Sequence, residues 1–457
     1  MKGRLDLLRS NIGNTASRGP HLSICPGCLR VRRDFTSPSL ATQYPPARRR
    51  DQSTWAHAAS VAQHMLNGGS KMDSSFAGVS VDPLRIVAKE MKFLNKNIQQ
   101  LLGSGHPMLD TVAKYYTHSE GKHIRPLLVL LMSRATALIP KSLRQSSLPT
   151  SSTIDNSISP PTVLSDANPS SPANNILSSS SMDASYNLGD SDILPSQRRL
   201  AEITELIHTA SLLHDDVIDN SVSRRSSPSA NTSFGNKMAV LAGDFLLGRA
   251  SVALARLRDV EVIELISTVI ANLVEGEFMQ LKNTALDEAQ PIWTEDTLSY
   301  YLQKTYLKSA SLISKSCRAT ALLGQNSPEA VEAAYSYGRN FGLAFQLVDD
   351  MLDYTTSSET LGKPAGADLE LGLATAPLLF AWKDNQQLGM LVGRKFSADG
   401  DVEMARELVA RSDGLEQTRA LAQEYADKAA HAVSKFPDSE AKDGLIEMCV
   451  KTMKRRK

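Results

Sequence analysis

Two clusters of aspartates, each inside an apolar stretch with helical spacing, place the strongest constraint on how this chain folds. The stretches are LIHTASLLHDDVIDN, with Asp215, Asp216 and Asp219, and FQLVDDMLDY, with Asp349, Asp350 and Asp353. Residues four apart share one face of an α-helix, so Asp215 and Asp219 project together while Asp216 points to another side. Like charges at this spacing repel unless something neutralises them. We therefore expect two acidic helices that face each other across a cation site.

The ligand type of both clusters favours a hard divalent cation. Oxygen ligands suit Mg²⁺, which takes one or two protein carboxylates and completes its shell with water and phosphate oxygens. A solvated helix face would explain a single cluster equally well, because charged residues are normally exposed. Two clusters in apolar helices fit that explanation poorly, so we predict a magnesium site. Its expected ligands are Asp215, Asp219, Asp349, Asp350 and Asp353.

Further motifs occur in the order found in one enzyme family. GKHIRP (121–126) precedes the first cluster, Arg224-Arg225 follows it, and GKPAGADLELGLATAP follows the second. With these motifs the chain resembles the trans-prenyl diphosphate synthases from about Asp82 to near its C-terminus. Within that family it is most similar to mitochondrial polyprenyl synthases of the hexaprenyl type, which make the ubiquinone side chain. The resemblance implies an all-α isoprenoid synthase fold, a helical bundle around a central cavity. It also implies head-to-tail trans addition of isopentenyl diphosphate to an allylic diphosphate.

Other functions stay open beside this one. A geranylgeranyl diphosphate synthase would carry the same motifs and make a shorter product. A non-catalytic subunit of a heteromeric synthase would share the fold, but such subunits typically have degraded Asp clusters, and both clusters are intact here. A terpene cyclase is disfavoured because its second metal site usually combines Asn, Ser or Thr, and Glu. We expect an active prenyltransferase that makes a hexaprenyl or longer diphosphate.

Basic residues near the first cluster are candidates for binding diphosphate. Lys122 and Arg125 are three apart, which would place both on one helical face at a spacing suited to a diphosphate. His208 alone would more simply be a core histidine of an apolar helix. The resemblance instead assigns isopentenyl diphosphate binding to Lys122, Arg125, His208 and Arg225. Ser226 stands where the family usually has a glycine.

The resemblance also assigns residues to the allylic diphosphate and to catalysis. The allylic site is expected to contain Arg224, Lys304, Thr305, Gln346 and Lys363. The catalytic residues are expected to be Asp215, Asp219, Lys304 and Lys363. Metal ions and these cations would stabilise the charge that develops on pyrophosphate as the allylic C–O bond breaks. Apolar walls would shield the resulting carbocation from water until the isopentenyl double bond attacks it.

Product length is expected to depend on the helical turn before the first cluster. One turn is about 5.4 Å, so Ala210 and Ser211 lie one turn deeper in the cavity than Asp215. Short-chain relatives carry an aromatic plug at one or both positions. Two small residues therefore predict an open tunnel and a product longer than farnesyl diphosphate.

Composition divides the chain into a leader, a catalytic domain and an insertion. Residues 1–75 are expected to form a mitochondrial transit peptide and disordered N-terminus, because the start is rich in Arg and poor in acids. A plain disordered basic tail is the alternative. The catalytic domain is expected over 81–457, interrupted at about 141–195 by a Ser-rich insertion too polar to offset its ordering entropy. The expected location is the matrix side of the mitochondrion.

The net charge and the hydropathy of the chain argue against nucleic acid binding and against a membrane-spanning helix. A net charge of +1 gives no indication of nucleic acid binding, and no apolar run reaches the length of about 20 residues that predicts a spanning helix. Asn231–Ala255 reads as an apolar helix rich in small residues, in a region that the resemblance places at a dimer interface. The expected partners are isopentenyl diphosphate, farnesyl or geranylgeranyl diphosphate, and a second copy of the chain. A heteromer is the alternative, and peripheral association with the inner membrane is a further expectation.

Overall fold

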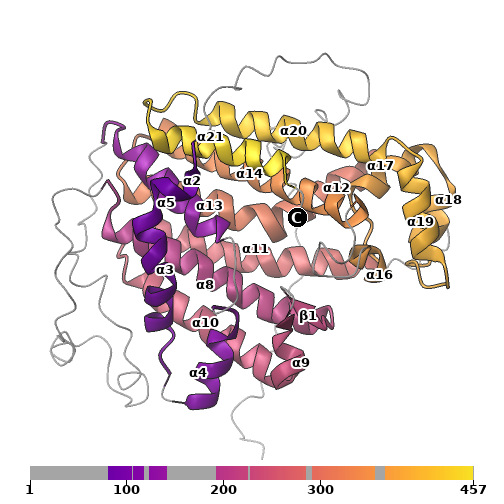
Figure 1. Cartoon of the computed structure of the whole chain (residues 1–457), viewed down its shortest axis with the longest axis horizontal. Coiled ribbons are helices and arrows are strands. Elements are labelled where there is room, and N and C mark those ends of the chain that lie inside the picture. The colour runs from indigo at the N-terminus through magenta and orange to yellow at the C-terminus, as the bar shows by residue number, and fades with distance from the viewer. Residues whose placement is uncertain are drawn as a thin grey trace, which may run out of the picture. The chain divides into compact units, whose positions relative to one another are not determined.

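The described part of the chain folds into α-helices with a single short β-hairpin (Figure 1). The computed structural model describes residues 81–104, 106–117, 123–141, 192–224, 227–284, 291–355 and 366–455, with only the backbone for 282–284. All of them belong to one compact unit, Gln52–Lys457. The expectation of an all-α fold is confirmed.

The elements follow one another along the chain in two groups. The first group is α2 (Pro83–Ile86), α3 (Ala88–Leu101), α4 (Pro107–Lys114), the 3₁₀ turn η1 (Tyr115–Thr117), α5 (Ile124–Ala137), α8 (Pro195–Ile218), β1 (Ser223–Arg224), β2 (Ser227–Pro228), α9 (Ala230–Phe234), α10 (Asn236–Ala255) and α11 (Val260–Thr284). The second group is α12 (Glu295–Thr305), the π-helical turn η3 (Tyr306–Ala310), α13 (Ser311–Leu323), α14 (Pro328–Thr355), α16 (Ala367–Glu370), α17 (Ala376–Asp384), α18 (Gln387–Gly393), α19 (Asp401–Ala410), α20 (Gly414–Ala432) and α21 (Glu440–Met453).

Several helices begin where the sequence supplies a cap. The Asp82 side chain accepts from the Leu84 N–H at 3.3 Å, and Pro83 occupies the first turn of α2. The imidazole of His106 accepts in the same way at the start of α4, and Pro107 follows it. These signals separate α3 from α4 near the His-Pro pair.

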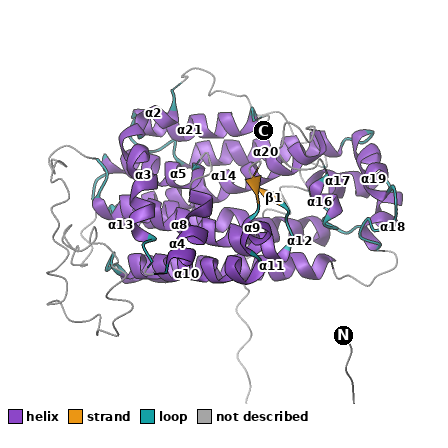
Figure 2. Cartoon of the chain, turned by 60° about the horizontal axis from the view of Figure 1, so that its bottom comes forward, coloured by secondary structure: helices purple, strands orange, loops and turns teal. Residues whose placement is uncertain are grey.

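The two acidic helices are the long, buried helices α8 and α14. Most residues of α8 are buried, and it packs against α10 and α5. α14 packs against α13 and α20. Each helix carries its aspartates in its last turns, at the end where burial gives way to partly exposed positions. The axes of the long helices α11, α14 and α20 are roughly aligned in both views (Figure 2).

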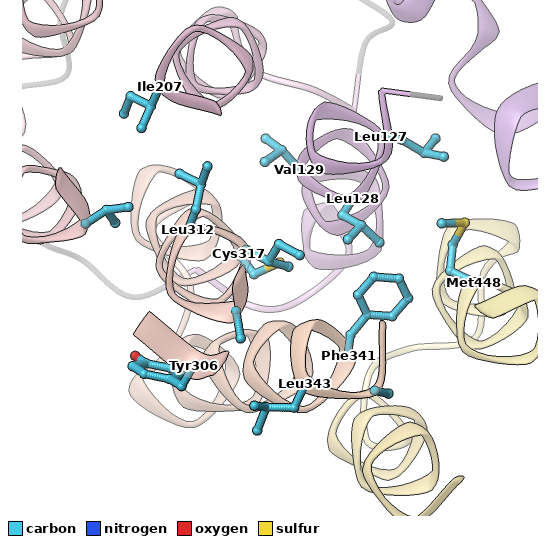
Figure 3. Close-up of a cluster of buried hydrophobic side chains, with 14 of the residues drawn as sticks. Leu127, Leu128, Val129, Ile207, Tyr306, Leu312, Cys317, Phe341, Leu343 and Met448 are labelled. Carbon is cyan, nitrogen blue, oxygen red and sulfur yellow. The ribbon is translucent and has the colours of Figure 1, made fainter. Parts of the chain in front are cut away.

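The core lies between helices that are far apart in the sequence. Figure 3 shows side chains from α5, α8, α13, α14 and α21 that converge on one apolar cluster. Leu128 and Phe341 have no exposed surface, and the thiol of Cys317 is buried beside them. Close packing of this kind holds α8 and α14 in a defined relative position.

The segment expected as one apolar helix, Asn231–Ala255, is divided into α9 and α10. Gly235 separates them with φ +84°, a conformation that is accessible to glycine and ends the helix. Among the described helices, α10 is long and apolar enough to cross a membrane by length and composition alone. It packs against α8 and α4, and 44% of the relevant window is buried inside the protein. This packing accounts for the buried part of its apolar surface.

Candidate active site

The first Asp cluster lies at the C-terminal end of α8, where Asp215 and Asp219 are partly buried. Burial raises the pKa of Asp215 from its ordinary 3.8 to about 6, against the opposing charge of Lys308 and with the support of Glu277. Burial also raises the pKa of Asp219, with the same two neighbours acting in the same directions. The carboxylates thus lie where burial disfavours their negative charge, and the charge of Lys308 offsets this only in part. A divalent cation would provide further positive charge.

Asp216 has no exposed surface and acts as an anchor. Nε of Arg224 donates to its two carboxylate oxygens at 2.8 and 3.0 Å, and Nη2 donates at 2.6 Å. The Tyr116 hydroxyl also donates to Asp216 and accepts from the Ala230 N–H at 2.9 Å. A buried charge held by several hydrogen bonds is costly to disrupt. Asp216 therefore connects α8 to η1, β1 and α9, and the predicted allylic ligand Arg224 is its partner.

The second cluster occupies the C-terminal part of α14. Asp350 is 3% exposed and accepts from the Tyr301 hydroxyl and, at 2.8 Å, from Nε2 of Gln346. Burial raises the pKa of Asp350 to about 6, and these two hydrogen bonds oppose the rise. Asp353 is also buried, and one of its oxygens accepts from the Asp368 N–H at 3.2 Å.

Asp349 is the more exposed member of the second cluster and pairs with the C-terminal end of the chain. Nη1 of Arg455 lies 3.0 Å from its Oδ1, and the guanidinium also stacks 4.7 Å from the centroid of the Phe345 ring. No sequence signal connects these residues, because the contact depends on how α21 packs against α14.

The π-helical turn η3 brings Lys308 to the first cluster. Its Nζ lies 2.5 Å from Oε2 of Glu277 and donates to Oε1 of Gln280 at 3.0 Å. The charge of Lys308 lowers the pKa values of Asp215 and Asp219 against the effect of burial, so it lies close to both.

The neighbouring residue of η3 connects to the second cluster. The Ser309 hydroxyl donates to Oε1 of Gln346 at 2.8 Å, and Gln346 in turn donates to Asp350. Adjacent residues of a single turn therefore interact with both Asp clusters, Lys308 through its charge and Ser309 through Gln346. Single π turns occur frequently at functional sites.

Lys304 and Thr305, which the sequence assigned to the allylic diphosphate, are only 8% and 3% exposed. Burial lowers the pKa of Lys304 and the nearby Asp350 opposes this, so the ammonium lies on the side of the second cluster. Its Nζ is 5.5 Å from the centroid of the Tyr301 ring. The resemblance assigned Lys304 and Thr305 but not Lys308, and the π turn that contains Lys308 has no signal in the sequence.

The N-terminal end of α5 meets α8 at two points. Nη1 of Arg125 donates to Nε2 of His208 at 2.9 Å, so these two predicted ligands of isopentenyl diphosphate come together. Nδ1 of His123 lies 2.9 Å from Oε1 of Glu205. His123 has a left-handed backbone with φ +40°, and α5 begins only at Ile124.

Of the two residues predicted to share one helical face, Lys122 and Arg125, the structure describes only Arg125, which follows the left-handed His123 in the first turn of α5, so this stays a prediction. Lys122 itself lies outside the described residues, as do Arg225 and Lys363.

The two predicted chain-length residues have different surroundings. Ala210 has no exposed surface and packs in the core. Ser211 is partly exposed, and its hydroxyl donates to the carbonyl of His208 at 2.9 Å. Ser211 is also one turn before Asp215 on the same side of α8. In this turn of α8, the side that carries Ser211 is therefore partly open to solvent, whereas the side that carries Ala210 is buried.

The donor set fits a hard divalent cation that is shared with a substrate. Within the described ranges, no three His, Cys, Asp or Glu side chains lie close enough to hold a metal ion by themselves. Mg²⁺ usually takes one or two carboxylates and completes its shell with water and phosphate oxygens. Each cluster presents carboxylates of this kind, and burial has raised the pKa of Asp215 and Asp350.

Comparison with known proteins establishes the family. The model of the polyprenyl synthetase family matches residues 165–409. The chain belongs to the polyprenyl synthetase family. It is 68% identical over 413 residues to the probable mitochondrial hexaprenyl pyrophosphate synthase of Neurospora crassa, with 90% of each chain covered.

Two further similarities agree with this membership. The synthase is 45% identical over 382 residues to the decaprenyl-diphosphate synthase subunit 1 of Schizosaccharomyces pombe, which covers 84% of this chain and 93% of that one. Its fold matches the polyprenyl synthase from Caulobacter crescentus CB15 complexed with calcium and isoprenyl diphosphate. The TM-score is 0.64 at 29% identity, with 82% of this chain and 97% of that one covered. The predictions of a prenyltransferase and of the isoprenoid synthase fold are confirmed.

Proposed function

We propose that this synthase makes hexaprenyl diphosphate for the ubiquinone side chain by repeated trans addition of isopentenyl diphosphate to an allylic primer. The observation that carries the proposal is the pair of Asp clusters on α8 and α14, with the charge of Lys308 acting on the first and Ser309 linked to the second through Gln346. The name of the Neurospora crassa relative, at 68% identity, supports the hexaprenyl length over a geranylgeranyl product.

The proposed cofactor is Mg²⁺. Asp215 and Asp219 would hold it on α8, and Asp349, Asp350 and Asp353 would hold it on α14. The bound ion would supply positive charge to the diphosphate that leaves the allylic substrate. The calcium in the Caulobacter crescentus structure supports a hard cation that prefers oxygen ligands.

The cations of the site would bind and stabilise the allylic diphosphate. We place its oxygens near Lys308 and Gln346, with Arg224, Lys304, Thr305 and Lys363 as further ligands or supports of the same site. Negative charge grows on the pyrophosphate as the allylic C–O bond breaks, and fixed positive groups stabilise it more strongly in a buried site than in water. The proposed catalytic residues remain Asp215, Asp219, Lys304 and Lys363. We add Lys308 to this set.

Isopentenyl diphosphate would bind at the junction of α5 and α8. Arg125 and His208 already form one hydrogen-bonded pair there, and Lys122 and Arg225 are proposed to complete the diphosphate site. The isopentenyl double bond attacks the allylic carbocation, one C–C bond forms, and a proton leaves from the adjacent carbon to the departing pyrophosphate. The product is an allylic diphosphate one isoprene unit longer, which can start another cycle. Ala210 and Ser211 stay the proposed chain-length positions.

The domain organisation and the location are also proposals. Residues 1–75 would form a mitochondrial transit peptide, since the Neurospora crassa relative carries a mitochondrial name, and we propose the matrix side. The Ser-rich insertion at about 141–195 would interrupt the catalytic domain over 81–457. The contacts at the two ends of the insertion support its attachment to the catalytic domain as a loop. Lys141 forms a β-bridge with Asn326, and Ile193 is buried.

We propose a homodimer through the apolar faces of α10 and α11. Large side chains on these helices are exposed in the isolated chain: Leu241, Val252, Val274, Phe278 and Leu281. Exposed apolar patches mark protein interfaces. The Schizosaccharomyces pombe relative is named as a subunit, so a heteromer is the alternative. Peripheral association with the inner membrane is a separate proposal.

The direct test of this function is metal-dependent transfer. The purified protein, incubated with Mg²⁺, labelled isopentenyl diphosphate and farnesyl diphosphate, should incorporate label, and EDTA should stop the reaction. Asp215→Ala and Asp350→Ala should each lose at least about 100-fold in kcat. Asp438→Ala, at a fully exposed carboxylate between α20 and α21, is the control and should keep full activity. A fully active Asp215→Ala protein would refute the assignment of the site.

A further inference from the structure

One turn of α11, residues 276–280, holds the side chain of Lys308 in place. Glu277 and Gln280 are each 8% exposed and lie on the same side of this helix. The ammonium of Lys308 lies 2.5 Å from the Glu277 carboxylate and donates to the Gln280 amide oxygen at 3.0 Å. The charged end of Lys308 is therefore held in one place by two buried partners.

The same turn of α11 also accommodates the stem of Lys308. A Cβ atom at Gly276 would lie 2.7 Å from Cγ of Lys308, 3.0 Å from its backbone N and 3.1 Å from Cβ of Leu307. Any side chain at position 276 would therefore push η3 away from α11. The absence of a side chain is what allows Lys308 to lie this close to Glu277.

The turn η3 is confined on its other side by α14. A Cβ atom at Gly342 would lie 2.6 Å from Cα of Ala310, so the backbones approach closely there. The hydroxyls of Tyr306 and Tyr335 are also 2.8 Å apart. Because η3 is in contact with α11 on one side and with α14 on the other, a change in this turn of α11 shifts the Lys308 ammonium relative to the Asp clusters.

The negative charge of Glu277 repels the nearby Asp cluster, and its pairing with Lys308 offsets this repulsion. Its charge raises the pKa values of Asp215 and Asp219, so it adds repulsion to a cluster that already contains several acids. A buried carboxylate is retained at little cost only when a cation pairs with it. The pairing keeps the Lys308 ammonium on α11 and off the two carboxylates that we assign to the metal.

We propose that Gly276 and Glu277 are positioning residues for Lys308: Gly276 admits its stem, and Glu277 orients its ammonium toward the allylic diphosphate. This inference rests on the proposed function, in which Lys308 binds that diphosphate. Without Glu277, the ammonium turns to Asp215 and Asp219 and competes with the metal ion. The consequence is weaker binding of the allylic substrate and a higher Mg²⁺ requirement, with no change at the isopentenyl site of Arg125 and His208.

The test is steady-state kinetics of the full-length protein. Glu277→Gln and Gly276→Ala should each raise KM for farnesyl diphosphate about tenfold or more, the effect of one lost charge-assisted hydrogen bond. KM for isopentenyl diphosphate should stay within about twofold, and the Mg²⁺ concentration for half-maximal rate should rise in Glu277→Gln. Glu277→Asp should restore part of the loss. Glu264→Gln, at an exposed position of the same helix, is the matched control.

A double-mutant cycle separates a positioning role from a structural one. In a Lys308→Gln background, Glu277→Gln should have no further effect on KM for farnesyl diphosphate, because Glu277 acts through Lys308. Additive effects, or equal rises in both KM values together with a lower Tm, would overturn the inference. Variants that keep the wild-type KM in an active enzyme would overturn it as well. A wild-type protein without prenyl transfer would instead refute the proposed function, so the two failures are distinguishable.

Discussion

Replacing Asp215 with asparagine should stabilise the metal-free protein above neutral pH. Burial raises the pKa of this carboxyl from 3.8 to about 6, so the folded state binds the proton more tightly than the unfolded state. Its favourable contribution to folding is complete below the unfolded pKa and is lost as the pH rises through the folded pKa. At higher pH the folded protein holds a charge that burial disfavours, and asparagine removes that charge.

The size of the effect follows from the shift. About two pKa units correspond to about 3 kcal/mol, at 1.36 kcal/mol per unit. Because Asp215 is partly exposed, solvent screening reduces this value, and we expect the free energy of unfolding to rise by about 1–2 kcal/mol at about pH 8. At about pH 5 the gain should be about half as large, because the folded carboxyl is still mostly protonated there.

Urea unfolding in EDTA at about pH 5 and pH 8 measures this difference. Asp438→Asn is the control, since an exposed carboxylate should change the free energy of unfolding by less than about 0.5 kcal/mol. Adding Mg²⁺ and pyrophosphate should stabilise the wild-type protein and have much less effect on Asp215→Asn, because the ligands bind the folded state through this carboxylate. An Asp215→Asn protein that is less stable than wild type at about pH 8 would refute the reasoning.

Three further substitutions test other parts of the account. Tyr116→Phe removes a donor to the buried Asp216 and should lower the free energy of unfolding by about 1–3 kcal/mol in urea titrations; unchanged stability would contradict the anchor role. Ser211→Phe should shorten the main product seen by chromatography, whereas Ala210→Phe should also cost about 1–3 kcal/mol of stability because Ala210 is fully buried; an unchanged product spectrum in both would refute the plug positions. Phe278→Glu should convert a dimer to a monomer in sedimentation velocity, and a monomeric wild-type protein would refute the proposed interface.

The fold and the acidic pair were predictable because their signals are local. Apolar residues at helical spacing around Asp215 and Asp349 reveal two buried helices, and paired carboxylates indicate a cation. The order of the motifs then indicated the family, which the comparisons confirm. Each of these steps uses residues close together in the sequence.

The finer geometry of the site was not predictable for physical reasons. The π turn η3 leaves no signal in the sequence, so the resemblance assigned Lys304 but not Lys308, whose charge acts on the first cluster. The left-handed backbone of His123 immediately before α5, and the contact of its imidazole with Glu205 of α8, have no local signal in the sequence. The remote pair of Asp349 and Arg455 depends on tertiary packing alone.

The length of the product tests the central claim most directly. The protein would be incubated with Mg²⁺, farnesyl diphosphate and excess labelled isopentenyl diphosphate, and the dephosphorylated products would be sized by chromatography, with Asp215→Ala as the inactive control. The account predicts a ladder that ends at the hexaprenyl product. A ladder that stops at the geranylgeranyl product, or no product from soluble, folded wild-type protein, would contradict it.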